Sequence, residues 1–161
     1  MENVANKTVN ALRERKMTIA TAESCTGGLV SAKITSVSGS SEVISFSMVT
    51  YSNEAKIQKL GVKKETVEQF GAVSEQTAKE MAERIKLLAA ADVGVGVTGV
   101  AGPSQSEGKP VGLVFVGIAF KDKTVVEKLN LKNLTRDEIR EESAEKALRL
   151  VLKGVTDAKQ E

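Results

Sequence analysis

The chain contains no histidine and no tryptophan, and it has a single cysteine among its 161 residues. The lack of histidine removes the usual general base and the commonest metal ligand. A Ser-His-Asp triad or a Cys-His pair within one chain is therefore excluded, and a zinc site would depend on carboxylates and one thiolate. A single cysteine also excludes a disulfide within the chain, which is typical of a cytoplasmic protein.

Aromatic residues, net charge and long apolar runs are also scarce. The formal net charge is +2, and the only aromatics are four phenylalanines and one tyrosine. The chain thus lacks the basic stripe and the stacking residues typical of nucleic-acid binders. It also lacks an apolar run near the roughly 20 residues of a membrane span, and a secretory signal. We expect one cytoplasmic domain over residues 1–161 that binds neither nucleic acid nor membrane.

Hydrophobic periodicity predicts alternating strands and helices along the chain. The first three strands are separated by helices, which implies crossovers and parallel pairing, whereas the last two share a short turn and imply a hairpin. We therefore predict an α/β fold with a mixed, mainly parallel sheet of about five strands and helices on both faces. Strands are expected at about 17–22, 42–51, 92–99, 111–120 and 124–131, and helices at about 2–15, 29–37, 52–60, 63–70, 74–90 and 135–153.

The stretch TAESCTGG at residues 21–28 places polar side chains where a strand gives way to a helix. Ligands in open α/β sheets bind beyond the carboxyl ends of strands, and a helix N-terminus offers N–H groups suited to an anion. Ser24, Cys25 and Thr26 could each donate a hydrogen bond there. In the alternative, Thr26 or Ser24 is only an N-cap, and Cys25 is a small buried side chain rather than a nucleophile.

Two further polar segments follow predicted strands. Tyr51, the only tyrosine, ends one of them, and Lys56 lies about one helical turn after Ser52. The glycine-rich loop after residue 99 could contact an anion through its backbone. Ordinary surface and turn roles are the alternative for both segments when only the spacing is considered.

Two motif matches fail the test of context. GVGVTG at residues 94–99 satisfies G-x-G-x-x-G, but its glycines lie inside a predicted strand rather than between a strand and a helix. Close approach of a neighbouring element or ligand explains them better. SEGK at residues 106–109 satisfies S-x-x-K, but the companion motifs S-D-N and K-T-G are absent. Neither a dinucleotide-binding fold nor a penicillin-recognising enzyme is predicted.

Together these segments resemble the CinA C-terminal domain family, in its stand-alone form, over about residues 5–152. The carriers are TAESCTGG, GSS, VTYSNEAKIQKLGV, GAVSEQTAKEMAE, TGVAGP followed by KPVG, and the R-x-x-I-R spacing of Arg136 and Arg140. The resemblance implies a three-layer α/β/α sandwich. It also implies amidohydrolysis of nicotinamide mononucleotide to nicotinic acid mononucleotide and ammonia, for NAD synthesis, with no metal and no organic cofactor.

The same resemblance implies roles for particular residues. Ser24 is the expected nucleophile, Lys56 its base after desolvation lowers the lysine pKa, and Tyr51 a proton relay or orienting group beside them. N–H groups after Ser24 would stabilise the oxyanion. The expected partners are a small pyridine nucleotide and further copies of the chain in a homo-oligomer. The implied substrate-binding positions are Glu23, Cys25, Thr26, Gly27, Gly28, Ser41, Gly99, Ala101, Gly102 and Arg140.

Two segments depart from the family pattern. The loop after TGVAGP reads SQSEG without the usual glycine pair, and Leu113 replaces a threonine. Leu134-Thr135 replaces Gly-Asp before the late arginines. Because both segments are expected near the nucleotide, two other functions stay open. One is a non-catalytic nucleotide-binding module linked to competence or DNA damage, and the other is a hydrolase of another amide or ester.

Overall fold

Five strands form one mixed sheet in the computed structural model, which describes residues 2–157. They are β1 (Ile19–Glu23), β2 (Ile44–Val49), β3 (Val93–Gly99), β4 (Leu113–Ala119) and β5 (Thr124–Asn130), in the spatial order β2-β1-β3-β4-β5. β1 pairs in parallel with β2 and with β3, whereas β4 pairs antiparallel with β3 and with β5. The predicted α/β class, the mixed sheet and the final hairpin are confirmed.

The expectation of a mainly parallel sheet is wrong, because two of the four strand pairs are antiparallel. Residues 100–112, which connect β3 to β4, contain no helix. A parallel partner for β3 would need a crossover connection, usually through a helix. The chain instead returns directly beside β3, and the connection becomes a long loop at the carboxyl end of that strand.

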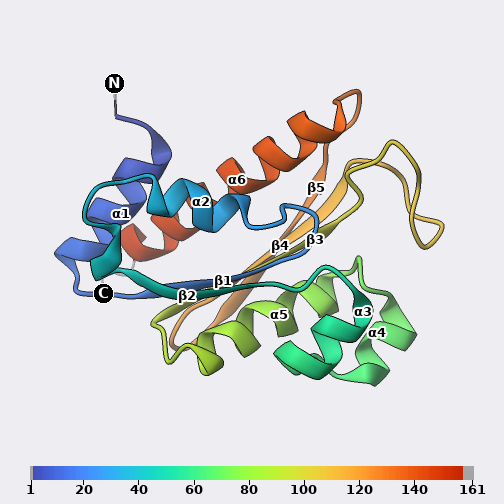
Figure 1. The fold of residues 1–161 in the computed structure, drawn as a ribbon, viewed down its shortest axis with the longest axis horizontal. Helices are drawn as coiled ribbons and strands as arrows, with labels where there is room; N and C mark the ends of the chain where they lie inside the picture. Colours follow the sequence, from blue (N-terminus) through green and yellow to red (C-terminus); the bar gives the residue numbers. More distant parts are fainter. Residues whose placement is uncertain (1, 158–161) are drawn as a thin grey trace.

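Helices cover both faces of the sheet. Figure 1 shows α1 (Val4–Glu14), α2 (Leu29–Thr35) and α6 (Arg136–Asp157) on one side, and α3 (Asn53–Ala55), α4 (Lys64–Phe70) and α5 (Glu75–Leu88) on the other. The larger apolar core includes buried residues of α1, α2 and α6, and a smaller one includes residues of β1 and α5. Within residues 2–157, no helix has the length and apolar character that a membrane span needs.

Local sequence signals mark several helix ends correctly. Ser74 caps α5 by accepting a hydrogen bond from the N–H of Thr77 over 3.1 Å. Thr135 and Glu138 form the expected capping box before α6, with reciprocal hydrogen bonds of 3.0 and 3.2 Å. The helix expected at 52–60 is divided, however, into α3 and a π-helix, η2 (Lys56–Leu60). A short 3-10 turn, η1 (Ser40–Glu42), precedes β2.

Glycines in the sheet let α5 lie directly against it. A Cβ atom at Gly96 would stand 2.6 Å from the carbonyl oxygen of Ala78, and one at Gly94 would stand 2.1 Å from that of Ala82. Both distances are shorter than any real Cβ contact, so larger residues would push the helix away. Helix packing therefore explains the glycines of the G-x-G-x-x-G match, and it fixes the start of α5 beside the end of β3.

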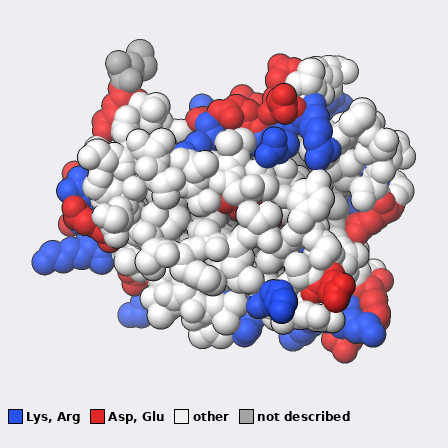
Figure 2. All heavy atoms as spheres, in the orientation of Figure 1, with Lys and Arg blue, Asp and Glu red and all other residues white. Residues whose placement is uncertain are grey.

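The face that carries β2 is nearly uncharged. β2 is an edge strand, and no residue from 44 to 53 is charged. Phe46, Val49 and Tyr51 expose 43%, 54% and 60% of their surfaces. Figure 2 shows charged side chains gathered around the margins of the face that it displays, with few in its centre. Uncharged edge strands are prone to pair with other chains, and the expected homo-oligomer stays a prediction.

Candidate active site

Ser24 stands just beyond β1, in the turn that leads to α2. Its N–H continues the sheet by donating to the carbonyl oxygen of Val97 on β3 over 2.9 Å, and the residue is 8% exposed. The turn closes on Gly27 and Gly28, whose φ angles of +58° and +101° lie in the left-handed region that favours glycine. The hydroxyl is thus carried by a tightly constrained backbone at the carboxyl end of β1.

The carboxylate of Glu23 organises this turn from the interior. It is fully buried, and it accepts hydrogen bonds of 2.7–3.0 Å from the hydroxyls of Thr21 and Thr26 and from the N–H groups of Val30 and Ser31. Two hydroxyl donors and two helix N–H donors satisfy the carboxylate entirely within the protein. Glu23 is therefore a structural centre of the turn rather than a group that faces a ligand.

The alternative in which Ser24 or Thr26 caps α2 is wrong. Gly28 occupies the N-cap position, and it offers no side-chain hydrogen bond. The N–H groups at the start of α2 go to Glu23 instead, because that carboxylate lies directly beneath them. The hydroxyl of Ser24 is consequently available for another role.

Lys56 reaches the Ser24 hydroxyl from the opposite side of the site. Ser52 caps α3, and the chain then widens at Lys56 into the single-turn π-helix η2, a feature frequent at functional sites. Lys56 Nζ lies 2.9 Å from Ser24 Oγ, 2.8 Å from the carbonyl oxygen of Thr50 and 3.2 Å from that of Tyr51. The residue is 1% exposed. Its amine is held by three oxygens and has no ion pair among the described residues.

Burial lowers the pKa of one group beside Ser24, Lys56, and raises the pKa of another, Cys25. It lowers the pKa of Lys56 to about 8, although the nearby Cys25 and Glu107 oppose this change. Burial also raises the pKa of the Cys25 thiol to about 12, against smaller opposing effects of its own backbone and of Lys56. At pH 7 about a tenth of the lysine is a free amine, and this share rises with pH, whereas the cysteine stays a thiol. Cys25 is thus a poor nucleophile. This agrees with the alternative interpretation of the sequence, in which Cys25 is only a small buried side chain.

A cavity of about 420 Å³ opens onto this Ser24–Lys56 pair. Its walls come from the turn after β1, from the start of α3, from the segment before α5, from the loop after β3 and from the first turn of α6. The lining residues are Ser24, Cys25, Tyr51, Asn53, Lys56, Ala72, Val73, Thr98, Gly99, Val100, Ala101, Gly102, Pro103, Ser104, Ser106, Glu107 and Arg136.

The cavity brings together about half of the positions singled out in the sequence. Ser24, Cys25, Tyr51, Lys56, Gly99, Ala101 and Gly102 line it. Glu23, Thr26, Gly27, Gly28, Ser41 and Arg140 do not. Ser41 lies exposed in η1, at the far end of α2 from the turn. The remaining five either form the turn or, like Arg140, contact its backbone.

The two late arginines contact different parts of the site: Arg140 binds the turn after β1, and Arg136 lines the cavity. Arg140 donates through Nε to the carbonyl oxygen of Cys25 over 3.1 Å and through a terminal nitrogen to that of Thr26 over 3.2 Å. Arg136 lines the cavity, where it donates to the hydroxyl of Tyr51 over 3.0 Å and to the carbonyl oxygen of Gly102. Spacing of four residues along one helix could not show which arginine faces the ligand.

Glu107 is a cavity residue that the sequence reasoning missed. It lies in the SEGK stretch, which reads as a solvated loop, and its ionic partner Lys109 is two residues away. The only signal in the sequence was the departure of this loop from the family pattern. Among residues 2–157, no three Cys, Asp or Glu side chains are grouped as a metal site. The contact between Lys56 Nζ and Ser24 Oγ is an arrangement that could support proton transfer between an amine and a hydroxyl.

Fold and site define a class of protein: an α/β domain that holds a serine hydroxyl against a buried lysine amine beyond the carboxyl end of an interior strand. The family model of the CinA C-terminal domain matches residues 1–155. This chain therefore belongs to the CinA C-terminal domain family.

Individual relatives agree with that placement. A CinA-like protein of Kosmotoga olearia is 49% identical over 155 residues, which are 96% of this chain and 37% of that protein. The chain spans 34–37% of the length of three such curated relatives. Among solved structures, the competence/damage inducible protein CihA of Agrobacterium tumefaciens is 37% identical, with a TM-score of 0.90 over 95% of this chain and 93% of that one. A CinA superfamily protein of Klebsiella pneumoniae is 28% identical, with a TM-score of 0.92 over 96% of both chains.

Proposed function

We propose that this protein is an amidohydrolase that converts nicotinamide mononucleotide and water to nicotinic acid mononucleotide and ammonia. The observation that carries the proposal is the 2.9 Å contact between Lys56 Nζ and Ser24 Oγ in the wall of a cavity. A serine hydroxyl becomes a nucleophile only beside a base. In a chain without histidine, a desolvated lysine is the base at hand. The substrate is the one that the resemblance to the family implies.

The oxygens around Lys56 Nζ direct its lone pair. The carbonyl oxygens of Thr50 and Tyr51 can only accept hydrogen bonds, so they take two N–H bonds of the amine. In the neutral amine, the remaining tetrahedral position holds the lone pair, and it faces Ser24 Oγ. The serine proton can then pass to Nζ without any rearrangement of the lysine.

The proposed reaction uses this geometry in both of its halves. Lys56 takes the proton of Ser24 as Oγ attacks the carboxamide carbon, which forms a tetrahedral intermediate. The lysine ammonium returns that proton to the leaving nitrogen, the carbon–nitrogen bond breaks, and ammonia departs from an acyl-serine ester. Lys56 then accepts a proton from water, whose oxygen attacks the ester carbon. Return of the proton to Oγ frees the serine and releases a carboxylic acid, which loses its remaining proton to solvent and becomes the carboxylate product.

The backbone of the turn supplies a donor for the oxyanion of each tetrahedral intermediate. The N–H of Ser24 is committed to Val97, but within residues 2–157 the N–H of Cys25 meets no acceptor on another residue. Arg140 holds the carbonyl oxygen of Cys25, which belongs to the next peptide unit, and so it fixes the chain just after this donor. A single donor of this kind typically contributes about 10²–10³ in rate. We therefore assign the oxyanion contact to Cys25 through its backbone.

Arg136 is the cation proposed for the 5′-phosphate. It faces the cavity, and its hydrogen bonds go to two neutral oxygens, those of Tyr51 and Gly102. No carboxylate of the described residues lies within ion-pair distance of it. Guanidinium groups bind phosphate in a bidentate way. Arg140, the candidate from the sequence, instead donates its hydrogen bonds to carbonyl oxygens of the turn that carries Ser24. Tyr51 accepts a hydrogen bond from Arg136 in the cavity wall.

The experiment that tests the proposal compares the wild-type protein with Ser24→Ala and with Ser38→Ala, an exposed serine outside the site. Each is incubated with nicotinamide mononucleotide, and nicotinic acid mononucleotide and ammonia are quantified. We expect equimolar products from the wild type and the control, and a loss of about 10³-fold or more in Ser24→Ala.

Other outcomes select among the alternatives. Equal turnover by Ser24→Ala would remove the serine nucleophile while keeping the reaction. A folded wild type that binds the nucleotide without turnover would refute the enzyme and favour the nucleotide-binding module. Turnover of other pyridine amides, but not of the mononucleotide, would favour a hydrolase of another amide.

A further inference from the structure

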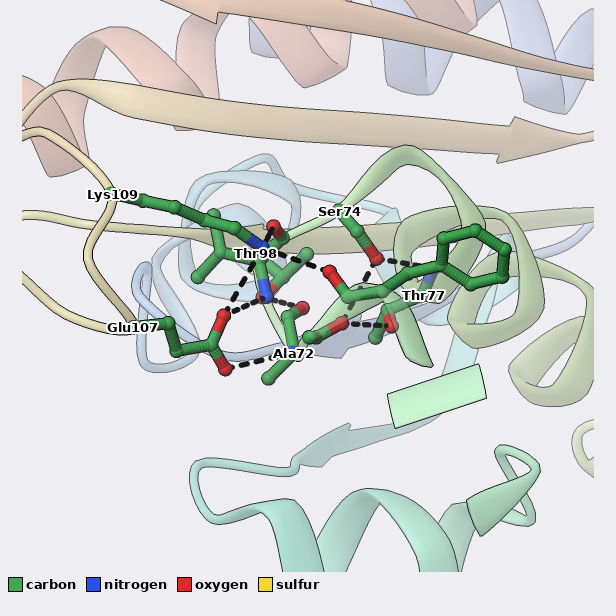
Figure 3. A network of polar contacts seen from close by, with 9 residues as sticks. Ala72, Ser74, Thr77, Thr98, Glu107 and Lys109 are labelled. Atoms are coloured by element: carbon green, nitrogen blue, oxygen red, sulfur yellow. Dashed lines mark hydrogen bonds and ion pairs between the residues drawn. The ribbon is translucent and has the colours of Figure 1, made fainter. Parts of the chain in front are cut away.

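Glu107 joins the loop after β3 to the opposite wall of the cavity. We call residues 102–109 the pocket loop. The Glu107 carboxylate accepts hydrogen bonds from the backbone N–H groups of Ala72 over 2.8 Å and Val73 over 3.1 Å, as Figure 3 shows. These two donors follow one another in the chain and take one carboxylate oxygen each. All three residues line the cavity, so the contact closes one side of it.

Lys109 strengthens the same contact by donating to carbonyl oxygens of the segment that receives Glu107. Its Nζ donates to the carbonyl oxygens of Phe70, over 2.9 Å, and of Val73, and it lies 3.3 Å from a Glu107 carboxylate oxygen. Gly71 makes room for this pair, since a Cβ there would stand 2.6 Å from both charged groups and its φ is +87°. The hydrogen bonds and Lys109 hold the pKa of Glu107 below its usual range, although burial opposes them.

The segment that receives Glu107 is itself firmly held. Thr98 on β3 donates through its hydroxyl to the carbonyl oxygen of Ala72 over 2.8 Å. The hydroxyls of Ser74 and Thr77, at the start of α5, both donate to the carbonyl oxygen of Gly71, over 2.9 and 2.7 Å. Figure 3 shows these bonds converging on one short stretch of backbone. Residues 71–73 therefore form a rigid anchor that joins the sheet to α5.

The pocket loop has few other attachments. At one end, Arg136 donates to the carbonyl oxygen of Gly102. Residues 103–106 between the two ends are exposed. Three of them, Pro103, Ser104 and Ser106, form cavity wall. The position of that wall depends on how the loop is tied at Glu107.

We propose that Glu107 is a positioning residue, which fixes the pocket loop against residues 71–73 and so sets how tightly the site binds its nucleotide. The proposal rests on the proposed function for the identity of that nucleotide. Ser24, Lys56 and the oxygens that hold the amine lie outside the loop. Releasing the loop therefore weakens binding while the reacting groups stay in place.

Glu107→Gln is the decisive variant, because it keeps the size and shape of the side chain. A glutamine presents one acceptor oxygen and one NH2 donor, so at least one of the N–H groups of Ala72 and Val73 would face a donor. A role in packing alone would tolerate this change. Gln105→Ala is the matched control, since residue 105 is exposed in the same loop and does not line the cavity.

Two measurements are made on wild type, Glu107→Gln and Gln105→Ala at pH 9, where Lys56 is mostly neutral in all three. Hydrogen exchange reports the protection of the Ala72 and Val73 amides without any substrate. Steady-state kinetics with nicotinamide mononucleotide separate KM from kcat. We expect Glu107→Gln to exchange these amides at least about 10-fold faster and to raise KM about 10-fold, with kcat within about 2-fold. The control should match the wild type in both.

Three results would overturn the proposal. Unchanged amide protection in Glu107→Gln would show that the contact does not hold the loop. Lost protection with an unchanged KM would leave Glu107 a purely structural residue. A fall in kcat as large as the fall in kcat/KM would place the effect on the chemical step.

Failure of the proposed function is distinguishable from these results. If the wild type binds the nucleotide without turnover, its Kd by calorimetry replaces KM, and the same 10-fold weakening is expected. A wild type that neither converts nor binds the nucleotide refutes the proposed function and the part of this proposal that concerns substrate. The exchange rates then still decide whether Glu107 fixes the loop.

Discussion

The pH dependence of catalysis tests the proposed role of Lys56 directly. Burial lowers its pKa from the ordinary 10.5 to about 8, and only the neutral amine can accept the proton of Ser24. At pH 7.5 about a quarter of the buried amine is neutral, against about one in a thousand for an ordinary lysine. Burial thus raises the active fraction about 200-fold, and this fraction still increases as the pH rises.

The assay is the initial rate of ammonia release from nicotinamide mononucleotide between pH 6.5 and 9.5 at constant ionic strength. We expect kcat/KM to rise about 10-fold from pH 7 to pH 9 and to level off above the pKa of Lys56. Glu107 raises that pKa through its charge, so Glu107→Gln should move the midpoint to lower pH. Circular dichroism at each pH serves as the control for folding.

A second arm of the same test needs no substrate. The folded pKa of Lys56 lies below the unfolded one, so the unfolded state binds more protons between about pH 8 and 10.5. The free energy of unfolding therefore rises with pH through that window, and the burial penalty is fully present only below it. Relative to Lys56→Met, wild type should gain about 2–3 kcal/mol between pH 7 and 10 in urea unfolding.

Two results would refute this reasoning. A profile of kcat/KM that is flat from pH 7 to pH 9 would mean that no group of this pKa limits the reaction. A rate that still rises at pH 10, with no difference in stability slope from Lys56→Met, would mean that Lys56 titrates as an ordinary surface lysine.

Two further predictions concern residues around the site. Arg136→Met should raise KM for the mononucleotide about 10-fold or more while leaving KM for nicotinamide riboside unchanged, because only the former carries the phosphate. The control is Arg149→Met, an exposed change on the same helix. Equal effects of Arg136→Met on both substrates would contradict the assignment. Glu23→Gln should lower the free energy of unfolding by about 3 kcal/mol, measured by urea denaturation, because its NH2 would face buried donors. A loss below about 1 kcal/mol would contradict the structural role of Glu23.

Much of the fold could be predicted from local patterns in the sequence. Ser74 and the Thr135–Glu138 box mark helix starts because capping depends on residues three apart, which a sequence displays directly. The antiparallel return from β3 to β4 was missed, although a connection without a helix is itself a signal of such a return. The π-helix at Lys56 escaped notice for a similar reason, since one widened turn hardly disturbs the apolar spacing.

The site shows where reasoning from sequence stops. Ser24 and Lys56 are 32 residues apart, and their contact depends on how β1 and α3 meet in space. The resemblance to a family singled them out; spacing did not. The sequence left the choice between the two late arginines open and did not single out Glu107, because lining a cavity is a property of tertiary packing. The rotation of α6 decides the first, and the path of the pocket loop decides the second.

The first turns of α6 have a consequence for how the site holds together. Arg136 ties the pocket loop and Tyr51, and Arg140, one turn later, ties the turn that carries Ser24. Two walls of the cavity are therefore both held by hydrogen bonds from the first turns of α6. Fraying of these turns would remove one fastening from each wall at the same time, so the two walls would loosen together rather than independently.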